Sequence, residues 1–385
     1  MVYVTVKQSP MYHQMSLEEF LFGGASEQPV LNQNMTNTRT YEFQELSEYM
    51  RRKLGVSTSG LIQRLAEFNA KTEQLRAKPR HDLYYEFYIP KKSGGLRKID
   101  APQPELMDAL RELKTIFEEN FHALYHTAAF AYIRHRSTVD AIKRHQSNES
   151  RWYAKYDLSN FFGSTTLDFI LKMFAMIYPF SEVANDQTGY VELKKALELA
   201  ILDGGLPQGT PISPIITNIM MIPVDYKISN ALRDFNKQRY VYTRYADDFQ
   251  VSSRYDFSFR EVEQLIVSTL AEFGAPFTLN KQKTRYGSTA GRNFNLGLMV
   301  CNGDDGGVRI TVGAEKKRRF KAMLSSFVLD TLHGKPWDIN DVQVMEGHRN
   351  YYRMVEGETI DDIVNNIGKK YGVDILKMIK EQLSV

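Results

Sequence analysis

The spacing of apolar residues predicts helices near the start of the chain and again further along it. Residues 1–80 contain two amphipathic runs, 43–54 and 59–78, the first followed by a glycine and the second by a proline. Glycine just after the last apolar position, or proline beyond it, is a usual end of a helix. Ser137 and Asp140 have the spacing of a capping box, which predicts that another helix begins there.

The middle of the chain alternates short strand-like runs with helical segments. Residues 239–245 and 249–253 are rich in aromatic and β-branched residues and predict a β-hairpin. Residues 153–156 indicate a third strand that enters the core. Between these strands, residues 163–203 predict two helices joined by a loop near position 185.

Acidic residues stand where these strands end. Asp247 and Asp248 fall at the tip of the hairpin, where we expect them to be exposed and to point the same way, and Asp157 ends the earlier strand. Adjacent carboxylates repel one another unless a cation neutralises them, and oxygen ligands suit Mg²⁺. Taken alone, the hairpin pair is explained at least as well by a solvated turn, because aspartate is a common turn residue.

A loop dense in glycine and proline separates the acidic sites. It covers residues 204–214 and precedes an apolar stretch, 215–223, in which Asn218 is the one strongly polar residue. This pattern predicts a shaped loop in front of a buried helix. A strand with its aspartate, a loop with its helix and a hairpin with two aspartates, in this order over roughly ninety residues, are harder to obtain by chance than any one of them.

Composition indicates a large core and directs attention to local charge. The chain has 385 residues, 43% of them hydrophobic, which is enough for two or three subdomains. The net charge is only +3, so affinity for nucleic acid would have to come from local basic patches. The strongest patch, 316–321, opens a predicted helix with an apolar side. The apolar residues of that helix are Phe320, Leu324, Phe327 and Val328. Smaller patches contain residues 51–53 and Arg134, Arg136, Lys143 and Arg144.

Cysteine content and hydropathy exclude several classes of protein. The single cysteine, Cys301, rules out an internal disulfide and a cysteine-based zinc site. The sequence has no apolar run of about 18 residues and no signal-peptide core, so we expect a cytoplasmic protein without a membrane partner. After a turn at 301–307 and a strand at 308–312, the remaining residues are predicted to be helical.

In this order, the motifs resemble those of bacterial reverse transcriptases, the group that contains retron, group II intron and defence-associated enzymes. The similarity runs from about residue 84 to residue 300. The matching segments are 89–99, 130–138, 157–162, 206–218, 245–248, 279–284 and 294–298. The combination is highly specific for the superfamily and less specific for the subgroup.

The resemblance implies an α+β fold of the right-hand polymerase type. Fingers and palm would occupy residues 81–300, and the palm would hold an antiparallel sheet that carries the Asp247-Asp248 hairpin. A helical N-terminal extension would occupy residues 1–80 and a helical thumb residues 301–385. The side chains expected to bind nucleic acid are Arg134, Arg136, Lys316, Lys317, Arg318 and Arg319.

The resemblance also implies a catalytic centre with two Mg²⁺ ions roughly 4 Å apart, for which Mn²⁺ is a substitute. The ligands would be Asp157, Asp247, Asp248 and the carbonyl of Leu158. The side chains expected at the triphosphate are Lys91, Lys92 and Arg97, and the choice between the two lysines stays open. Lys283 resembles the lysine proposed to protonate the leaving pyrophosphate. Each of these cations is also explained by a solvated surface charge.

Phe162, five residues after Asp157, occupies the position that selects the sugar in the family. A bulky ring there would clash with a ribose 2′-hydroxyl and would favour deoxynucleotides. Gln208 is expected beside the incoming sugar or the templating base. The alternatives are that Phe161 and Phe162 are both core aromatics and that Gln208 holds its loop by hydrogen bonds to backbone.

The function implied by the resemblance is RNA-directed DNA synthesis from an RNA template, a DNA or RNA primer and dNTPs. A retron-like or phage-defence enzyme fits best, with a structured non-coding RNA and an effector protein as further partners. The chain departs from the retron pattern at Asn295, Leu296 and Gly297, where retron enzymes carry Val-Thr-Gly. The alternatives are a template-independent or protein-primed DNA polymerase of the same fold and a non-catalytic RNA-binding scaffold, which the three carboxylates disfavour.

Overall fold

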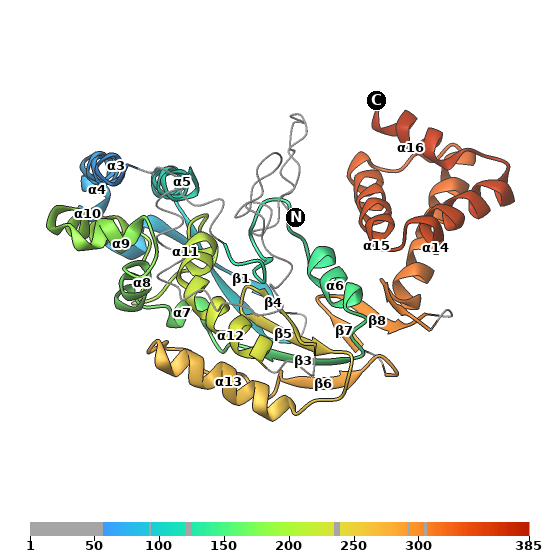
Figure 1. Ribbon diagram of the computed structural model, residues 1–385. Helices are drawn as coiled ribbons and strands as arrows, with labels where there is room; N and C mark the ends of the chain where they lie inside the picture. Colours follow the sequence, from blue (N-terminus) through green and yellow to red (C-terminus); the bar gives the residue numbers. More distant parts are fainter. Residues whose placement is uncertain are drawn as a thin grey trace, which may run out of the picture.

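The computed structural model in Figure 1 describes residues 57–91, 94–119, 125–234, 239–291, 293–303 and 306–384. Several sequence predictions lie outside these ranges, namely the helix at 43–54, the basic residues 51–53 and the side chain of Lys92. Within the part of the chain that is described, no helix is long and apolar enough to cross a membrane.

The described chain is mainly helical, with short strands between the helices. The helices before the last third are α3 (Thr58–Lys71), α4 (Glu73–Ala77), the 3₁₀ helix η1 (Arg80–Leu83), α5 (Pro104–Glu119), α6 (Thr138–Ser147), α7 (Phe161–Ser164), α8 (Leu167–Phe174), α9 (Phe180–Asn185), α10 (Gln187–Glu198), α11 (Ser213–Met220), α12 (Ile222–Asp234) and α13 (Phe259–Glu272). The last helices are α14 (Ala314–Leu332), α15 (Ile339–Tyr371) and α16 (Ile375–Leu383). The strands are β1 (Tyr84–Pro90), β2 (Leu96–Pro102), β3 (Trp152–Asp157), β4 (Val241–Tyr245), β5 (Asp248–Ser253), β6 (Arg285–Ser288), β7 (Asn293–Asn295), β8 (Leu298–Asn302) and β9 (Val308–Thr311).

Three antiparallel sheets organise these strands. β1 and β2 form a two-stranded sheet, the central sheet has the order β4-β5-β3-β6, and the third sheet has the order β7-β8-β9. In the central sheet, β3 lies between β5 and β6, and Asp157 at the end of β3 pairs with Asp248 at the start of β5. Strands that are far apart in sequence therefore bring acidic residues to one end of the same sheet.

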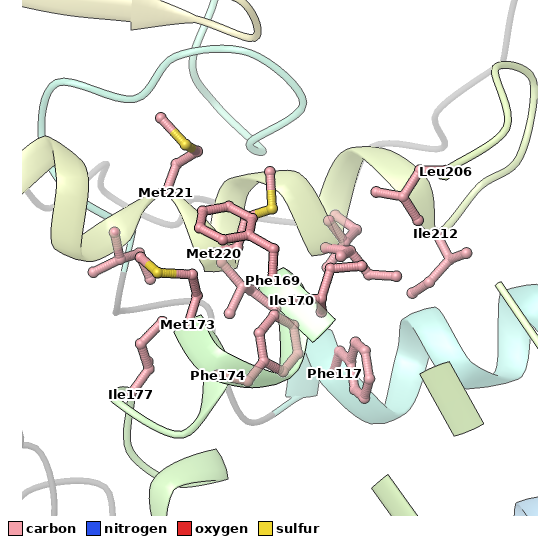
Figure 2. Packing of buried hydrophobic residues seen from close by; sticks show 14 of the residues in the cluster. Phe117, Phe169, Ile170, Met173, Phe174, Ile177, Leu206, Ile212, Met220 and Met221 are labelled. Atoms are coloured by element: carbon pink, nitrogen blue, oxygen red, sulfur yellow. The ribbon is translucent and has the colours of Figure 1, made fainter. Parts of the chain in front are cut away.

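The larger hydrophobic core contains the helices that pack around α11. Figure 2 shows Phe117, Phe169, Ile170, Phe174 and Met220 gathered in this core, from α5, α8 and α11. The apolar residues of α11 are almost completely removed from solvent, with exposed fractions of at most 2%. The buried helix predicted behind the glycine-proline loop is thus confirmed, and it holds that loop against the core.

A second hydrophobic core joins the three-stranded sheet to the last helices. Phe320, Leu324, Phe327 and Val328 of α14 are at most 1% exposed, as the predicted apolar side requires. Figure 1 shows α14, α15 and α16 standing together in red, beyond the central sheet. Val139 and Ile142 of α6 belong to this core, so α6 connects it to the rest of the molecule. The three-stranded sheet runs across residue 300, and the predicted domain boundaries stay a prediction.

The helical predictions were right in type but wrong in some boundaries. The helix expected at 59–78 breaks at Thr72, whose hydroxyl bonds the Phe68 carbonyl, so two helices form. Residues 163–203 contain the end of α7 and three further helices, α8, α9 and α10, instead of two. Asp186 lies between α9 and α10, where a connection was expected, and it caps α10 by accepting a hydrogen bond from the Gly189 amide at 2.7 Å. The turn expected at 301–307 starts later, because Cys301 still belongs to β8.

The predicted capping box at the start of α6 is confirmed. The Ser137 hydroxyl accepts a hydrogen bond from the Asp140 amide, and the Asp140 carboxylate accepts one from the Ser137 amide at 2.8 Å. These reciprocal bonds satisfy two backbone donors that the first helical turn leaves without partners. They fix the point at which the chain leaves the loop before α6 and enters the helix.

A buried glutamate ties the long helix α15 to the third sheet. The helix kinks at Glu356 and Gly357, where the backbone angles are not helical. The Glu356 carboxylate accepts hydrogen bonds from the Thr311 hydroxyl at 2.7 Å, the Val312 amide at 2.8 Å and the Lys317 ammonium at 2.7 Å. Burial raises the pKa of Glu356, but these three donors outweigh it and the pKa is lowered. The kink is therefore held by a charged side chain and not by the glycine alone.

Candidate active site

The hairpin between β4 and β5 brings the predicted carboxylates together. Ala246 sits in its turn with a φ of +57°, a left-handed conformation that a residue with a Cβ rarely adopts. The Leu158 amide donates to the Asp247 carbonyl at 3.1 Å, and Asp157 pairs with Asp248 across the sheet. Three carboxylates from two distant segments thus meet at one end of the central sheet.

The acidic residues are less exposed than the sequence predicted. Asp157 is buried and Asp247 and Asp248 are half-buried, because β3 and β5 lie side by side and shield their ends from solvent. Burial and the nearby Asp157 raise the pKa of Asp247. Burial, and then the neighbouring carboxylates, raise the pKa of Asp248 to about 6, against the lowering effect of Lys155. Crowded and partly desolvated carboxylates of this kind favour a bound cation.

Two lysines neutralise part of this negative charge. The Lys283 ammonium donates to Asp157 at 2.7 Å, and this hydrogen bond is the main cause that raises the pKa of Lys283. Lys155 forms an ion pair with Asp248 at 2.9 Å. The chain places Lys283 by a backbone bond from the Asn280 amide to the Asp157 carbonyl at 2.7 Å, which joins the segment after α13 to the end of β3.

The residues at this end of the sheet fit a divalent metal ion. Among the residues that the structure describes, no group of three or more His, Cys, Asp or Glu side chains is arranged to hold a metal ion as it stands. In this arrangement Asp157 and Asp248 are each paired with a lysine. The Asp248 Oδ1 atom, however, is buried and has no hydrogen-bond partner in the described part of the chain. An unpartnered carboxylate oxygen beside other carboxylates is the donor that Mg²⁺ prefers.

Phe162 follows Asp157 by five residues and contacts the glycine-proline loop through its backbone. Phe161 is 2% exposed and belongs to the core, whereas Phe162 is half-buried and packs on the surface of that core. The two rings are 5.5 Å apart between centroids. The Phe162 carbonyl accepts a hydrogen bond from the Leu206 amide at 2.9 Å. Of the two aromatic residues, only Phe162 retains an exposed surface that a substrate can contact.

Replacing Gly205 with alanine is expected to lower the free energy of unfolding by about 2 kcal/mol, as overpacking substitutions do. A Cβ at Gly205 would lie 2.1 Å from the Gly163 carbonyl oxygen, so backbone would have to move. Gly204 is the matched control, because its Cβ would meet no atom within 4 Å and only its φ of +78° opposes a side chain. Urea unfolding of both variants should show a larger loss for Gly205→Ala, and equal losses would contradict the close contact.

Gln208 lies where the two-stranded sheet meets the loop. Its backbone carbonyl accepts a hydrogen bond from the Asp100 amide of β2 at 2.8 Å. Gln208 also lines a cavity of about 290 Å³. The other residues that line this cavity are Lys98, Asp100, Asn160, Gly163, Leu202, Asp203, Leu206 and Pro207. The backbone of Gln208 therefore anchors β2, at the place where the residue also borders this cavity.

The basic residues predicted at the triphosphate belong to the β1–β2 hairpin. Lys91 opens its turn, where the Lys91 amide donates to the Gly95 carbonyl at 3.0 Å. Arg97 follows in β2 and pairs with Ile89 across the two strands. Both side chains are exposed, and Lys92 lies outside the described residues. The hairpin is joined to the glycine-proline loop through Asp100, so both belong to the same region of the molecule.

The residues predicted to bind nucleic acid divide into two groups. Arg318 and Arg319 are exposed on α14, and Arg134 is exposed before α6. Lys316 instead donates to the Gly297 carbonyl at 2.6 Å, and Lys317 pairs with Glu356. Arg136 donates to the His126 and Ala129 carbonyls at 2.8 and 2.6 Å, and burial lowers its pKa to about 10. Arg319 and Arg134 also pair, with Glu315 and Glu118, but both stay exposed. We expect Lys316, Lys317 and Arg136 to stabilise the fold first, because each of them is half-buried as well as bonded within the fold.

Sequence reasoning missed three residues that shape the site. Lys155 stands two positions before Asp157 on β3, and the two-residue period of a strand puts both on one face. That period would have been a sufficient signal for Lys155. Arg244 and Asp225 form a fully buried ion pair at 2.8 Å behind the hairpin. No local pattern marks this pair, because 19 residues separate the partners and one lies in a helix, the other in a strand.

Comparison with known proteins agrees with this geometry. The family described as "Reverse transcriptase (RNA-dependent DNA polymerase)" matches residues 89–320. The Retron Ec83 reverse transcriptase of Escherichia coli is 29% identical over 310 residues, which cover 79% of this chain and 92% of that protein. The Retron Ec73 reverse transcriptase of the same species is 29% identical over 222 residues, 56% of this chain and 67% of that protein. The chain belongs to the reverse transcriptase family.

Solved structures show a more distant likeness. Apo telomerase from Candida tropicalis aligns with a TM-score of 0.46 and 14% identity, over 78% of this chain and 62% of that one. The family match and the retron relatives, together with the grouped carboxylates, support RNA-directed DNA polymerase activity for this α+β chain.

Proposed function

We propose that this protein copies an RNA template into DNA by nucleotidyl transfer at the end of the central sheet, with Mg²⁺ as its cofactor. The observation that carries the proposal is the pairing of Asp157 with Asp248, which puts carboxylates from β3 and from the β4–β5 hairpin beside one another. Phosphoryl transfer asks a protein mainly to position its substrates and to stabilise charge, and clustered carboxylates do this through bound cations.

Two Mg²⁺ ions would be held by Asp157, Asp247 and the Leu158 carbonyl, with Asp248 assisting. When bound, they would stabilise the negative charge that develops on the reacting phosphate and on both oxygens of the exchange. Lys283, 2.7 Å from Asp157, is close enough to give a proton to a leaving pyrophosphate held there. Asp157 and Asp247 are the main ligands in this proposal, and Asp248, which pairs with Lys155 at 2.9 Å, assists them.

Substrate would enter between the β1–β2 hairpin and the carboxylates. Lys91, Lys92 and Arg97 would bind the triphosphate, for which the fork of an arginine supplies two parallel donors. Phe162, with its exposed surface, would exclude a ribose 2′-hydroxyl. The Gln208 side chain would contact the sugar or the templating base from the cavity that it lines.

In this proposal the described elements take the parts of a right-handed polymerase. The β1–β2 hairpin and α5 would serve as fingers, the central sheet as palm and the last helices as thumb. Residues 81–300 would form fingers and palm and residues 301–385 the thumb, and most of the extension expected at 1–80 lies outside the described residues. Arg134, Arg318 and Arg319 would contact the phosphates of a template–primer duplex, since they are exposed cations.

The match to retron reverse transcriptases favours a structured non-coding RNA as the template. An effector protein in a phage-defence system is a further partner in this proposal. Retron Ec83 and Ec73 reverse transcriptases match the chain over much of its length. The net charge of the chain is only +3, so general attraction to RNA is weak. Recognition of the shape of one structured RNA would explain how the protein selects its template.

Primer extension tests the proposed activity. Purified protein would be given Mg²⁺, a poly(rA)/oligo(dT) duplex and either dTTP or UTP. We expect template-length DNA from dTTP and almost no product from UTP. RNA that copurifies with the protein would be sequenced and supplied as a second template. Products of random length on every template would indicate template-independent synthesis, and no product on either template would contradict the proposal.

A further inference from the structure

A buried arginine lies directly behind the turn that carries Asp247. Arg244 and Asp225 have side chains with no exposed surface. The guanidinium Nε and Nη2 atoms donate to the two carboxylate oxygens of Asp225, each at 2.8 Å. Tyr242 adds a hydrogen bond to the same carboxylate at 2.7 Å. Asp225 therefore holds the arginine in one orientation through both of its oxygens.

The remaining guanidinium nitrogen reaches the hairpin turn. Arg244 Nη1 donates to the Ala246 carbonyl at 3.1 Å. Ala246 has a φ of +57°, which is strained for a residue with a Cβ and persists only where surrounding contacts impose it. The peptide unit that accepts this hydrogen bond also contains the amide nitrogen of Asp247. The direction of that peptide is therefore coupled to the position of the arginine.

Arg244 also connects the hairpin to the chain segment before α6. Its amide donates to the Ala128 carbonyl at 2.6 Å, and its carbonyl accepts from the Phe130 amide at 2.9 Å. Asn218 of α11 donates to the Ala131 carbonyl at 2.7 Å and lies 3.4 Å from the guanidinium. The segment before α6 and α11 thus both contact Arg244 at the base of the turn, the first through its backbone and the second through its guanidinium.

Stability alone is a weak reason for this arrangement. The free-energy cost of removing two charges from water offsets much of the attraction between them. Apolar pairs of similar volume can therefore often replace a buried ion pair without loss of stability. An apolar pair, however, has no donor for the Ala246 carbonyl. What Arg244 supplies, and a hydrophobic replacement would not, is the hydrogen bond that directs the turn.

We infer that Arg244, oriented by Asp225, is a positioning residue that holds the Ala246 turn so that Asp247 faces Asp157. This inference rests on the proposed function for its kinetic consequence, but not for its structural one. It predicts that the hairpin turn loosens when the contact to Ala246 is lost, while the rest of the fold stays intact. It also predicts that turnover falls without a loss of nucleotide binding.

Two variants remove the contact in different ways. Arg244→Lys keeps the charge, but a single ammonium cannot bind both Asp225 oxygens and also reach Ala246. The triple variant Asp225→Leu, Tyr242→Phe, Arg244→Met replaces the whole polar cluster by apolar groups and leaves no buried charge behind. Tyr242→Phe alone is the matched control, because it removes one bond to Asp225 and preserves the contact between Arg244 and Ala246.

Hydrogen exchange measured by mass spectrometry gives a readout that does not depend on activity. In both test variants, we expect faster exchange in peptides that cover 241–253 and at the Leu158 amide, which donates to Asp247. Peptides from α8 and α11 should keep their protection. Tyr242→Phe should leave all of these peptides unchanged. If wild-type protein fails to synthesise DNA, the proposed function fails, but this comparison still tests the positioning role.

Steady-state kinetics gives the second readout. We expect kcat to fall about 10²-fold in both test variants, the loss that a misplacement of about 1 Å produces. The KM for dTTP should stay within threefold, and Tyr242→Phe should retain kcat within threefold. Unchanged exchange in the hairpin would overturn the inference, as would wild-type kcat in a folded test variant. Loss of protection throughout both test variants would also overturn it, because Arg244 would then belong to the fold as a whole.

Discussion

Replacing Asp247 with asparagine is expected to lower the rate of DNA synthesis by at least about 10³-fold, because a metal carboxylate accounts for several kcal/mol of transition-state stabilisation. Asparagine keeps the volume of the side chain but removes its charge. The measurement is single-turnover incorporation of dTTP on poly(rA)/oligo(dT) at saturating protein.

The same variant should not lose stability. Burial and Asp157 raise the pKa of Asp247 in the folded protein, so its ionised form is disfavoured relative to the unfolded chain. A charge with a raised carboxylate pKa destabilises the fold at neutral pH, and its removal should leave the melting temperature equal or higher. A loss of activity with no loss of stability would thus distinguish a functional carboxylate from a structural one.

Asp248→Asn serves as a comparison within the same hairpin. Because Lys155 already pairs with Asp248 at 2.9 Å, we expect a loss of only about tenfold, or about 1.4 kcal/mol. Asp108→Asn on the surface of α5, where the side chain is 77% exposed, should change neither rate nor stability. Equal losses at Asp247 and Asp248 would contradict the unequal roles, and activity in Asp247→Asn would contradict the proposed site.

Replacing Phe162 with alanine is expected to reduce discrimination against ribonucleotides by about 10–10²-fold. An apolar side chain that excludes one added hydroxyl discriminates by at most about this factor, because it acts by steric exclusion and leaves no polar group of the site without a hydrogen bond. The measurement is the ratio of kcat/KM for dTTP to that for UTP in single-nucleotide insertion. We expect the dTTP value to change little and the UTP value to rise.

The neighbouring aromatic residue is the matched control for this prediction. Phe161 is 2% exposed, so Phe161→Ala should cost about 3 kcal/mol or more of stability, as truncation of a core ring does. It should leave the ratio of dTTP to UTP nearly unchanged in the protein that stays folded. A larger change in the ratio for Phe161→Ala than for Phe162→Ala would contradict the assignment of Phe162 as the residue that selects the sugar.

Local sequence patterns predicted individual elements well and their ends less well. The capping box at Ser137 was visible because both partners lie within four residues. The break at Thr72 was not, because it depends on a side-chain bond that competes with the helix. The kink of α15 escaped prediction for a different reason, since Glu356 finds its partners on β9 and α14.

Residue pattern was enough to locate the three carboxylates and the apolar helix behind the loop. Strand, turn and helix signals are local, and catalytic residues placed at strand ends remain recognisable along the chain. The side chains that pair with those carboxylates could be identified only in the folded chain. The pairing of Lys155 and Lys283 with the acids depends on strand register, and the hold of Arg244 on Ala246 depends on packing of α12 behind the hairpin. Such contacts join residues that are distant in sequence, so only the tertiary arrangement brings their charges within bonding distance.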